Sequence, residues 1–103
     1  MNPKRLRIRS EARAELLRET EYYEKRQPGA GRRFRVAVQA AFNLILKFPS
    51  GGPLGTAGTR KTKVKGFPFT VVYREESTEV IVFAIAHDKK KPGYWMKSNP
   101  KGS

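Results

Sequence analysis

Residues 31–48 have the spacing of an α-helix but carry apolar side chains around most of its circumference. The expected helix opens at Gly31 and ends near Phe48, because Pro49 cannot continue it. Its main apolar arc consists of Phe34, Val38, Ala41, Phe42, Ile45 and Phe48. Further apolar residues lie outside that arc, namely Val36, Ala37, Ala40, Leu44 and Leu46. Such a helix has more surface to bury than one sheet face can cover. It therefore either forms a tight hairpin with another helix or offers a groove for a partner segment.

The segment before this helix predicts a strand and a first helix. Residues 4–9 alternate between apolar and basic side chains, which is typical of a half-buried strand. Ser10 is a suitable N-cap, and Glu11 falls in the first turn, where the helix dipole favours an anion. The helix is expected to run to about Arg26 and to stop before the next Pro-Gly pair.

The second half of the chain is rich in strand-forming sequence. A loop rich in Gly and Pro spans residues 49–59. Strand-like segments follow at 61–65, 69–74 and 80–86. The last of them is continuously apolar, which indicates a central strand. The element order β-α-α-β-β-β predicts an α+β domain, with a helical hairpin on one face of a four-stranded, mostly antiparallel sheet.

The length of 103 residues fits one domain, expected over residues 1–96 with a loose tail over 97–103. No apolar run reaches the roughly 18 residues of a membrane span, and no apolar segment follows the basic N-terminus as in a secretory signal. The chain has no Cys, which excludes disulfides and Cys metal sites and fits a reducing cytosol. We therefore expect a cytoplasmic protein with no membrane partner.

The charge is strongly basic. Lys and Arg number 22 against 9 Asp and Glu, giving a net charge of +13. This excess favours an acidic partner, such as nucleic acid, an acidic protein or anionic lipid, over a merely solvated surface. The basic residues concentrate in 4–9, 60–65 and 89–91. The alternation places two rows away from the apolar face, and in one sheet they would give it a basic open face: Arg5, Arg7 and Arg9, and Lys61, Lys63 and Lys65.

The stretch AHDKKKPGYW near the C-terminus holds the only His and the only Trp of the chain. His87 ends the apolar strand, and a lone His at such a corner is more typical of a structural role, because catalysis needs a partner within reach. Tyr94 and Trp95 are expected to fold back and cap the sheet, since Trp buries a large area. Lys89–Lys91 would then form an exposed basic loop between the strand and this aromatic cap.

Three segments carry a resemblance to a known family: YYEKRQPGAGRRF (22–34), FPFTVVYR (67–74) and AIAHDKKKPGYW (84–95). Together they resemble the RelE/ParE family of bacterial toxins, over about residues 5–95 and closer to the ParE branch. The resemblance implies the toxin of a type II toxin–antitoxin pair, of the kind linked to plasmid stabilisation. It also implies a hetero-oligomer with a cognate, ParD-like antitoxin, and neither a cofactor nor a metal.

The family resemblance implies two possible activities. RelE-like members cut mRNA on the ribosome without a metal, whereas ParE-like members poison DNA gyrase and are not enzymes. When Tyr73 is aligned with the strand tyrosine of RelE, two RelE lysines match Lys61 and Lys63. A RelE arginine, however, falls on Thr70, which cannot offer a guanidinium fork to a phosphate group. The resemblance therefore favours gyrase as the target.

The candidate residues follow from these two activities. For a nuclease, the catalytic candidates are Lys61, Lys63, His87, Lys89 and Tyr94. The predicted target-binding residues are Arg60, Lys61, Lys63, Lys65, Lys89, Lys90 and Lys91. The predicted antitoxin-binding residues are Leu17, Tyr23, Val36, Leu44 and Leu46. Structural roles are predicted for Tyr73, His87 and Trp95. A nucleic-acid-binding module without catalysis, and a toxin that folds but is inactive, stay open as alternatives.

Overall fold

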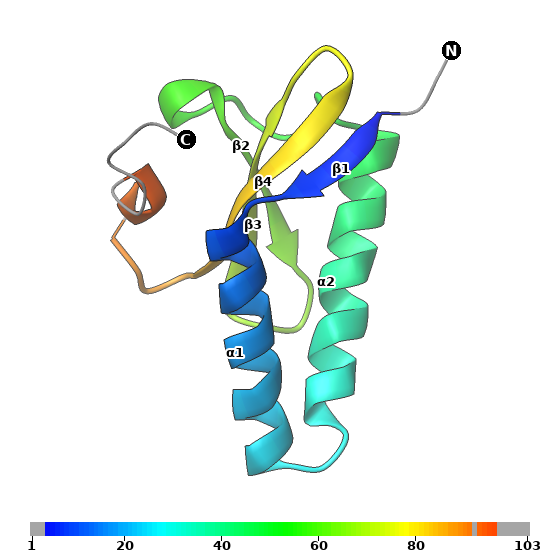
Figure 1. The fold of residues 1–103 in the computed structure, drawn as a ribbon, viewed down its shortest axis with the longest axis vertical. Coiled ribbons are helices and arrows are strands. Elements are labelled where there is room, and N and C mark those ends of the chain that lie inside the picture. Colours follow the sequence, from blue (N-terminus) through cyan, green and yellow to red (C-terminus); the bar gives the residue numbers. More distant parts are fainter. Residues whose placement is uncertain (1–3, 92, 97–103) are drawn as a thin grey trace.

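The computed structural model describes residues 4–91 and 93–96, which form two helices packed on a four-stranded sheet (Figure 1). The expected tail at 97–103 lies outside the described residues. The elements are β1 (Arg5–Ile8), α1 (Ser10–Arg26), α2 (Ala30–Lys47), β2 (Arg60–Val64), β3 (Phe69–Glu75) and β4 (Glu79–His87), with short 3-10 helices η1 (Thr56–Gly58) and η2 (Tyr94–Met96). This order confirms the predicted β-α-α-β-β-β arrangement.

The sheet is mixed, with the strand order β1-β4-β3-β2. β3 pairs antiparallel with both β2 and β4, and β1 pairs parallel with β4. The prediction of a mostly antiparallel sheet is therefore confirmed, with the one parallel pair at an edge. β4 lies inside the sheet, as its continuous apolar sequence predicted. β1 and β2 form opposite edges, which separates their basic side chains.

Two apolar clusters lie on opposite faces of the sheet. The larger joins α1 and α2 to the sheet and includes Val71 and Ile85. The smaller consists of Val72, Ala84 and Trp95. Because successive side chains of a strand point to opposite faces, neighbouring residues such as Val71 and Val72 belong to different clusters. The second cluster explains why β4 is continuously apolar from Val80 to Ala86.

The N-cap of α1 is Arg9, and the prediction of Ser10 is wrong. The reason is that β1 runs directly into the helix. The Arg9 N–H donates to the Val82 carbonyl oxygen (3.0 Å), and the Arg9 carbonyl accepts the first helical bond from the Arg13 N–H (2.9 Å). Ser10 therefore lies inside the first turn, with its hydroxyl donating to the Glu11 carboxylate (3.3 Å).

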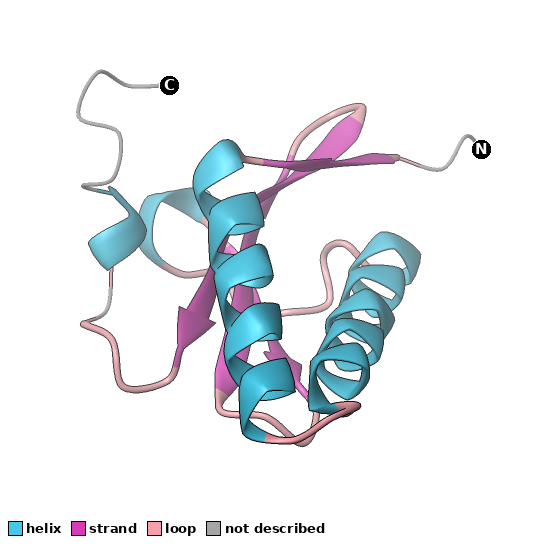
Figure 2. Cartoon of the chain, turned by 60° about the horizontal axis from the view of Figure 1, so that its bottom comes forward, coloured by secondary structure: helices cyan, strands magenta, loops and turns pink. Residues whose placement is uncertain are grey.

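The turn between the helices depends on Glu24. Its carboxylate accepts hydrogen bonds from the N–H groups of Gly29 (3.1 and 3.2 Å) and Gly31 (3.0 Å), which satisfies donors at the start of α2. Gly29 has φ +89°, in the left-handed region that favours glycine. A Cβ on Gly31 would lie 2.7 Å from the Thr20 carbonyl oxygen, so only glycine lets the helices approach this closely. The predicted hairpin of two helices forms (Figure 2). α2 begins at Ala30 instead of Gly31.

Candidate functional site

The chain after β4 folds back over the sheet and is bonded to α1. The Tyr94 hydroxyl donates a hydrogen bond to one oxygen of Glu15, and the other oxygen accepts one from the Ile85 N–H (2.9 Å). The Ile85 amide is available because β1 pairs with β4 only as far as Val82. Burial, followed by the bond to Glu15, raises the pKa of Tyr94 above its ordinary value of 10.0. Tyr94, a catalytic candidate, thus has its hydroxyl engaged within the fold.

Trp95 covers the sheet beside Phe83. Trp95 is 5% exposed, and the two rings meet edge to face with centroids 5.4 Å apart. Phe83 sits at a register shift between β3 and β4, where a bulge re-aims its side chain. The guanidinium groups of Arg9 and Arg74 lie 4.8 and 5.0 Å from the centre of the Phe83 ring. These two arginines therefore stabilise the small cluster through cation–π contacts.

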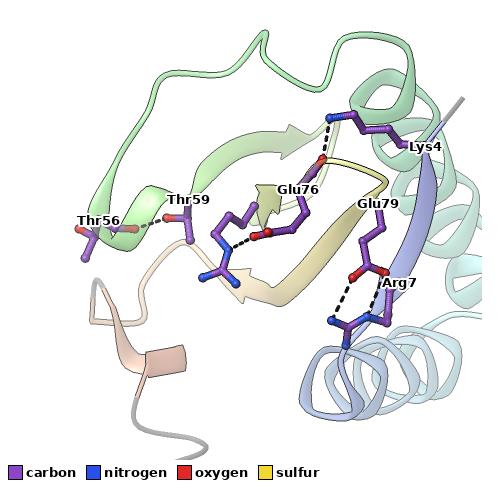
Figure 3. A network of polar contacts seen from close by, with 7 residues as sticks. Lys4, Arg7, Thr56, Thr59, Glu76 and Glu79 are labelled. Atoms are coloured by element: carbon purple, nitrogen blue, oxygen red, sulfur yellow. Dashed lines mark hydrogen bonds and ion pairs between the residues drawn. The ribbon is translucent and has the colours of Figure 1, made fainter. Parts of the chain in front are cut away.

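The two basic rows lie away from the main core, as predicted, but they do not meet on the open face of the sheet. The β1 and β2 rows lie at opposite edges, with β4 and β3 between them, and Trp95 packs on those central strands. In the β1 row, Arg7 bonds both carboxylate oxygens of Glu79 (3.2 and 3.3 Å; Figure 3), and Arg9 contacts Phe83. Lys65 follows β2 and lies in the turn before β3. The candidate surface is therefore confined to the β2 side.

A pocket of about 130 Å³ brings together three of the nuclease candidates, Lys61, His87 and Tyr94, but not Lys63 or Lys89. It lies between the sheet and the chain that follows β4, and its lining includes Lys61, Thr70, His87, Lys90 and Lys91. These residues come from three separate segments. The hydrogen bonds that the polar side chains of this pocket make determine which catalytic steps those side chains can perform.

Asp88 is the central anion of this region. It accepts hydrogen bonds from the Lys63 ammonium (2.7 Å) and the Thr70 hydroxyl (2.9 Å). The bond from Lys63 is the main reason that the pKa of Asp88 lies below its ordinary value of 3.8. Lys63 also donates to the Phe67 carbonyl oxygen (2.5 Å). A phosphate group near Thr70 would therefore meet a carboxylate where RelE has an arginine, and the charge of Lys63 is already balanced.

His87 orients the turn that follows β4. Its Nδ1 accepts a hydrogen bond from the Lys89 N–H (3.1 Å), and its carbonyl oxygen accepts one from the Lys90 N–H (2.9 Å). Its ring also meets Phe69 edge to face, with centroids 5.0 Å apart. When Nδ1 accepts a bond, the proton of the neutral ring lies on Nε2, so Nε2 cannot accept a proton. In the described residues no hydrogen bond joins His87 to a carboxylate that would orient it for catalysis.

The predicted target-binding residues divide into two groups. Arg60 donates to the Gly52 carbonyl oxygen (2.6 Å) and Lys63 pairs with Asp88, so both act within the fold. The other five are exposed, and no ion pair joins them to a carboxylate in the described part of the chain. We call these five residues the basic rim: Lys61, Lys65, Lys89, Lys90 and Lys91.

The predicted antitoxin-binding residues also divide. Leu17, Val36 and Leu44 are 62%, 59% and 52% exposed, although the hairpin has formed. Tyr23 and Leu46 instead pack against the main core. The apolar surface of Tyr23 and Leu46 is therefore used largely by the fold. Leu17, Val36 and Leu44 are the members of the set that a partner can reach.

A groove of about 320 Å³ runs between the two helices. Leu16, Val36 and Phe42 supply apolar lining, and Arg32 and Arg35 contribute cations. Sequence reasoning missed these two arginines, because only the packing of α1 against α2 places them beside the apolar residues. The groove therefore combines an apolar floor with positive charge.

A second groove, of about 330 Å³, lies where α2 ends against β2. Leu44, Phe48 and Lys61 line it. Phe48 was assigned to the buried arc of the helix but is 55% exposed. The helix ends at Lys47, and Phe48 has φ −134° and ψ 69°, which takes its ring out of helical register.

A family model described as the ParE toxin of the type II toxin–antitoxin system, parDE, matches residues 6–92. The chain belongs to the ParE toxin family. No curated protein matches it. A solved structure described as the chromosomal ParDE TA system from P. aeruginosa is similar, with a TM-score of 0.72 and 17% identity over 82% of this chain and 95% of that chain. That likeness shows the fold alone.

This ParE-family chain has two carboxylates whose roles the sequence did not reveal. Glu15 belongs to the acidic first helix, and nothing in its spacing marks it as a partner for β4 and Tyr94. Asp88 had a visible signal, because it directly precedes three lysines. In the described segments no group of three or more His, Asp or Glu is placed to hold a metal ion. Neither α1 nor α2 combines the length and apolarity needed to cross a membrane.

Proposed function

We propose that this ParE-family toxin arrests growth by poisoning DNA gyrase, without enzymatic activity of its own, and that a ParD-like antitoxin neutralises it. Family membership supports the toxin role, and the similar fold from a ParDE system supports the type of antitoxin. The observation that carries the choice of gyrase is that three of the five nuclease candidates, Lys63, His87 and Tyr94, are bonded within the fold.

Cleavage of mRNA requires groups that activate a 2′-hydroxyl, stabilise a phosphorane and protonate the leaving oxygen. Here the Tyr94 hydroxyl binds Glu15, Lys63 binds Asp88, and Nδ1 of His87 accepts a backbone N–H. Thr70 stands where the phosphate-binding arginine would lie and bonds Asp88. These bonds favour an inhibitor that acts by binding.

The exposed helix face supports antitoxin binding. An amphipathic segment could bury the apolar side chains of Leu17, Val36 and Leu44, which are more than half exposed. Arg32 and Arg35 line the adjoining groove and would attract acidic residues of that segment. Docking at Leu17 and Val36 would thus use the side of the molecule formed by the helices, whereas a segment that also covers Leu44 would reach the groove that contains Lys61.

The proposal is tested by inducing the protein alone in bacteria and following both targets in the same cells. Linearised DNA and a DNA-damage response, with intact mRNA, are the expected results. Purified protein should also trap DNA breaks on supercoiled plasmid when gyrase is present, and none when gyrase is omitted. Co-expression of the cognate antitoxin should restore growth.

The pocket that gathers Lys61, His87 and Lys90 keeps RelE-like cleavage of mRNA as the second candidate. Rapid in-frame cleavage of mRNA with intact DNA would establish that activity and overturn the gyrase proposal. Normal growth with neither effect would overturn both and leave a nucleic-acid-binding module or an inactive toxin.

A further inference from the structure

The basic rim begins at one end of the sheet and extends along β2 to Lys61, which pairs with Val72 in the middle of β3. Phe69 pairs with His87, whereas Glu75 pairs with Val80, so these two pairs mark opposite ends of β3 and β4. Lys65 follows β2 and Lys89 follows β4, so both lie near the end that Phe69 and His87 mark. The acidic residues of the β3–β4 turn, including Glu75, lie at the other. The only carboxylate close to the rim residues in sequence, Asp88, is paired with Lys63.

Two distant segments are joined to make this rim. The Asp88 N–H donates to the Pro68 carbonyl oxygen (2.9 Å), which ties the β2–β3 turn to the loop after β4. Lys61 shares the 130 Å³ pocket with Lys90 and Lys91. The Lys90 ammonium also lies 5.3 Å from the centre of the Tyr94 ring. Lys61, Lys90 and Lys91 therefore line one pocket, and the Asp88–Pro68 bond holds together the two segments that carry Lys65 and Lys89.

The type of cation indicates contact with phosphate rather than with bases. All five rim residues are lysines, which bind phosphate as point charges and lack the fork that reads guanine edges. The arginines of β2 and β3 make other contacts. Arg60 donates to a backbone carbonyl oxygen, and Arg74 contacts Glu76 and Phe83. Such a surface holds a polyanion without reading its sequence.

The aromatic residues favour a duplex over a single strand. Proteins that hold single-stranded nucleic acid stack its bases on exposed aromatic rings. Next to the rim, Trp95 is 5% and Phe69 is 2% exposed, and Tyr94 has Lys90 over its ring. In the described residues, the pocket side of the rim therefore lacks an open aromatic platform, and the exposed ring of Phe48 lies beside Lys61 in the separate groove at the end of α2. The phosphates of a duplex need no such platform.

We propose that the basic rim binds the phosphate backbone of duplex DNA without sequence preference. Its cellular use rests on the proposed function, because gyrase holds duplex DNA and the rim would contact that DNA in the complex. The binding itself is a property of this chain and is measured with no gyrase present.

The test is fluorescence anisotropy with a labelled DNA duplex of about 20 base pairs, titrated between about 50 and 200 mM NaCl. Five neutralised phosphates predict a slope of log K against log salt of about −4 to −5. Lys61→Ala combined with Lys89→Ala and Lys91→Ala should reduce the slope to about −2 and weaken binding by roughly tenfold or more. Replacing the same three lysines by Arg should retain the slope.

The matched control removes the same charge elsewhere, through Arg13→Ala, Lys25→Ala and Arg26→Ala on exposed positions of α1. It should change binding by less than about threefold. Equal losses in the two triple variants would show that only net charge matters and would overturn the rim as a site. Circular dichroism and thermal melting check that each variant is folded.

Competition experiments separate the possible ligands. Stronger binding of single-stranded DNA or of duplex RNA of the same length would overturn the assignment to duplex DNA. So would displacement by polyglutamate as effective as displacement by DNA at equal charge, which would indicate an acidic protein. If wild-type protein binds duplex DNA through the rim but leaves gyrase unaffected, the proposed function fails while the DNA site stands. If the alanine variant loses DNA binding yet still poisons gyrase, the use of the rim in the complex is excluded.

Discussion

Glu15 and Tyr94 lie 79 positions apart in the sequence, and a hydrogen bond between them fastens the C-terminal segment to the first helix. The same carboxylate accepts the N–H of Ile85, at an edge of β4 that β1 leaves unpaired. Glu15 thus accepts the N–H of β4 that β1 leaves unpaired and also holds Tyr94 in place. The position of the lysine loop between His87 and Tyr94 depends on this link.

Tyr94→Phe should lower stability by about 1 kcal/mol at neutral pH, because it removes a hydrogen bond to a charged, half-buried group. Its pH dependence follows from the raised pKa of Tyr94. A group whose pKa is raised by folding contributes stability that is full below the unfolded value of 10.0 and is lost as pH rises through the folded value. Urea unfolding between about pH 8 and 11 should therefore show that the free energy of unfolding falls less steeply with rising pH in Tyr94→Phe than in the wild type. Tyr22→Phe, at a half-exposed position, is the control, and equal slopes for wild type and Tyr94→Phe would contradict the link.

Gly31→Ala should destabilise the fold by about 2 kcal/mol, because the new methyl group would meet the Thr20 carbonyl oxygen at 2.7 Å and force the helices apart. Denaturant unfolding measures this loss. Gly55→Ala is the matched control, since its Cβ would find its nearest neighbour, the Thr59 carbonyl oxygen, at 3.5 Å. If both substitutions cost the same, close approach of the helices is not the reason for glycine at position 31.

Asp88→Asn should strengthen binding to duplex DNA by about two- to fivefold and steepen the salt dependence by up to about 1. The reason is that Lys63 loses its carboxylate partner and becomes a further cation beside the basic rim. Anisotropy titrations measure both quantities. Glu21→Gln makes the same change in net charge on exposed α1 and should have a smaller effect. Unchanged or weaker binding by Asp88→Asn would show that Lys63 does not reach the DNA.

Val36→Glu should weaken binding of the cognate antitoxin by about tenfold or more while leaving the melting temperature unchanged, because Val36 is 59% exposed and lines the groove between the helices. Isothermal titration calorimetry of the purified pair gives the affinity. Leu54→Glu places the same charge at another exposed apolar residue, outside both helices, and should bind normally. Full neutralisation of the Val36→Glu toxin would remove this face from the antitoxin interface.

His87→Ala should cost about 1 to 2 kcal/mol, because the Lys89 N–H loses its acceptor and the contact with Phe69 is lost. His87→Asn retains an acceptor at a similar place and should recover part of that stability. Any loss of toxicity should then follow the loss of folded protein in both variants. A well-folded but inactive His87→Ala protein would contradict the structural role and favour the nuclease.

Local sequence was sufficient wherever neighbouring residues decide the structure. Alternation, helical spacing and the Gly and Pro positions predicted each helix and strand to within one or two residues, since these patterns depend on short-range geometry. The continuous apolar run correctly placed β4 inside the sheet. Local rules failed where they competed with strand pairing. They predicted Ser10 as the N-cap of α1, but the cap is Arg9, because the Arg9 N–H continues the pairing of β1 with β4 by donating to the Val82 carbonyl oxygen.

By itself, then, the sequence determined the elements, their order, the basic character and the family resemblance, because each of these is written in residue types and their spacing. Only the tertiary structure decided which charged and polar side chains are available to bind a partner and which are bonded within the fold. Pairing across the sheet engages Lys63 with Asp88, and packing of the chain end on α1 engages Tyr94 with Glu15. These contacts join residues 25 and 79 positions apart, and no local pattern encodes such a meeting. Strand order likewise placed the two predicted basic rows at opposite edges, since hydrogen bonding between strands depends on the whole sheet.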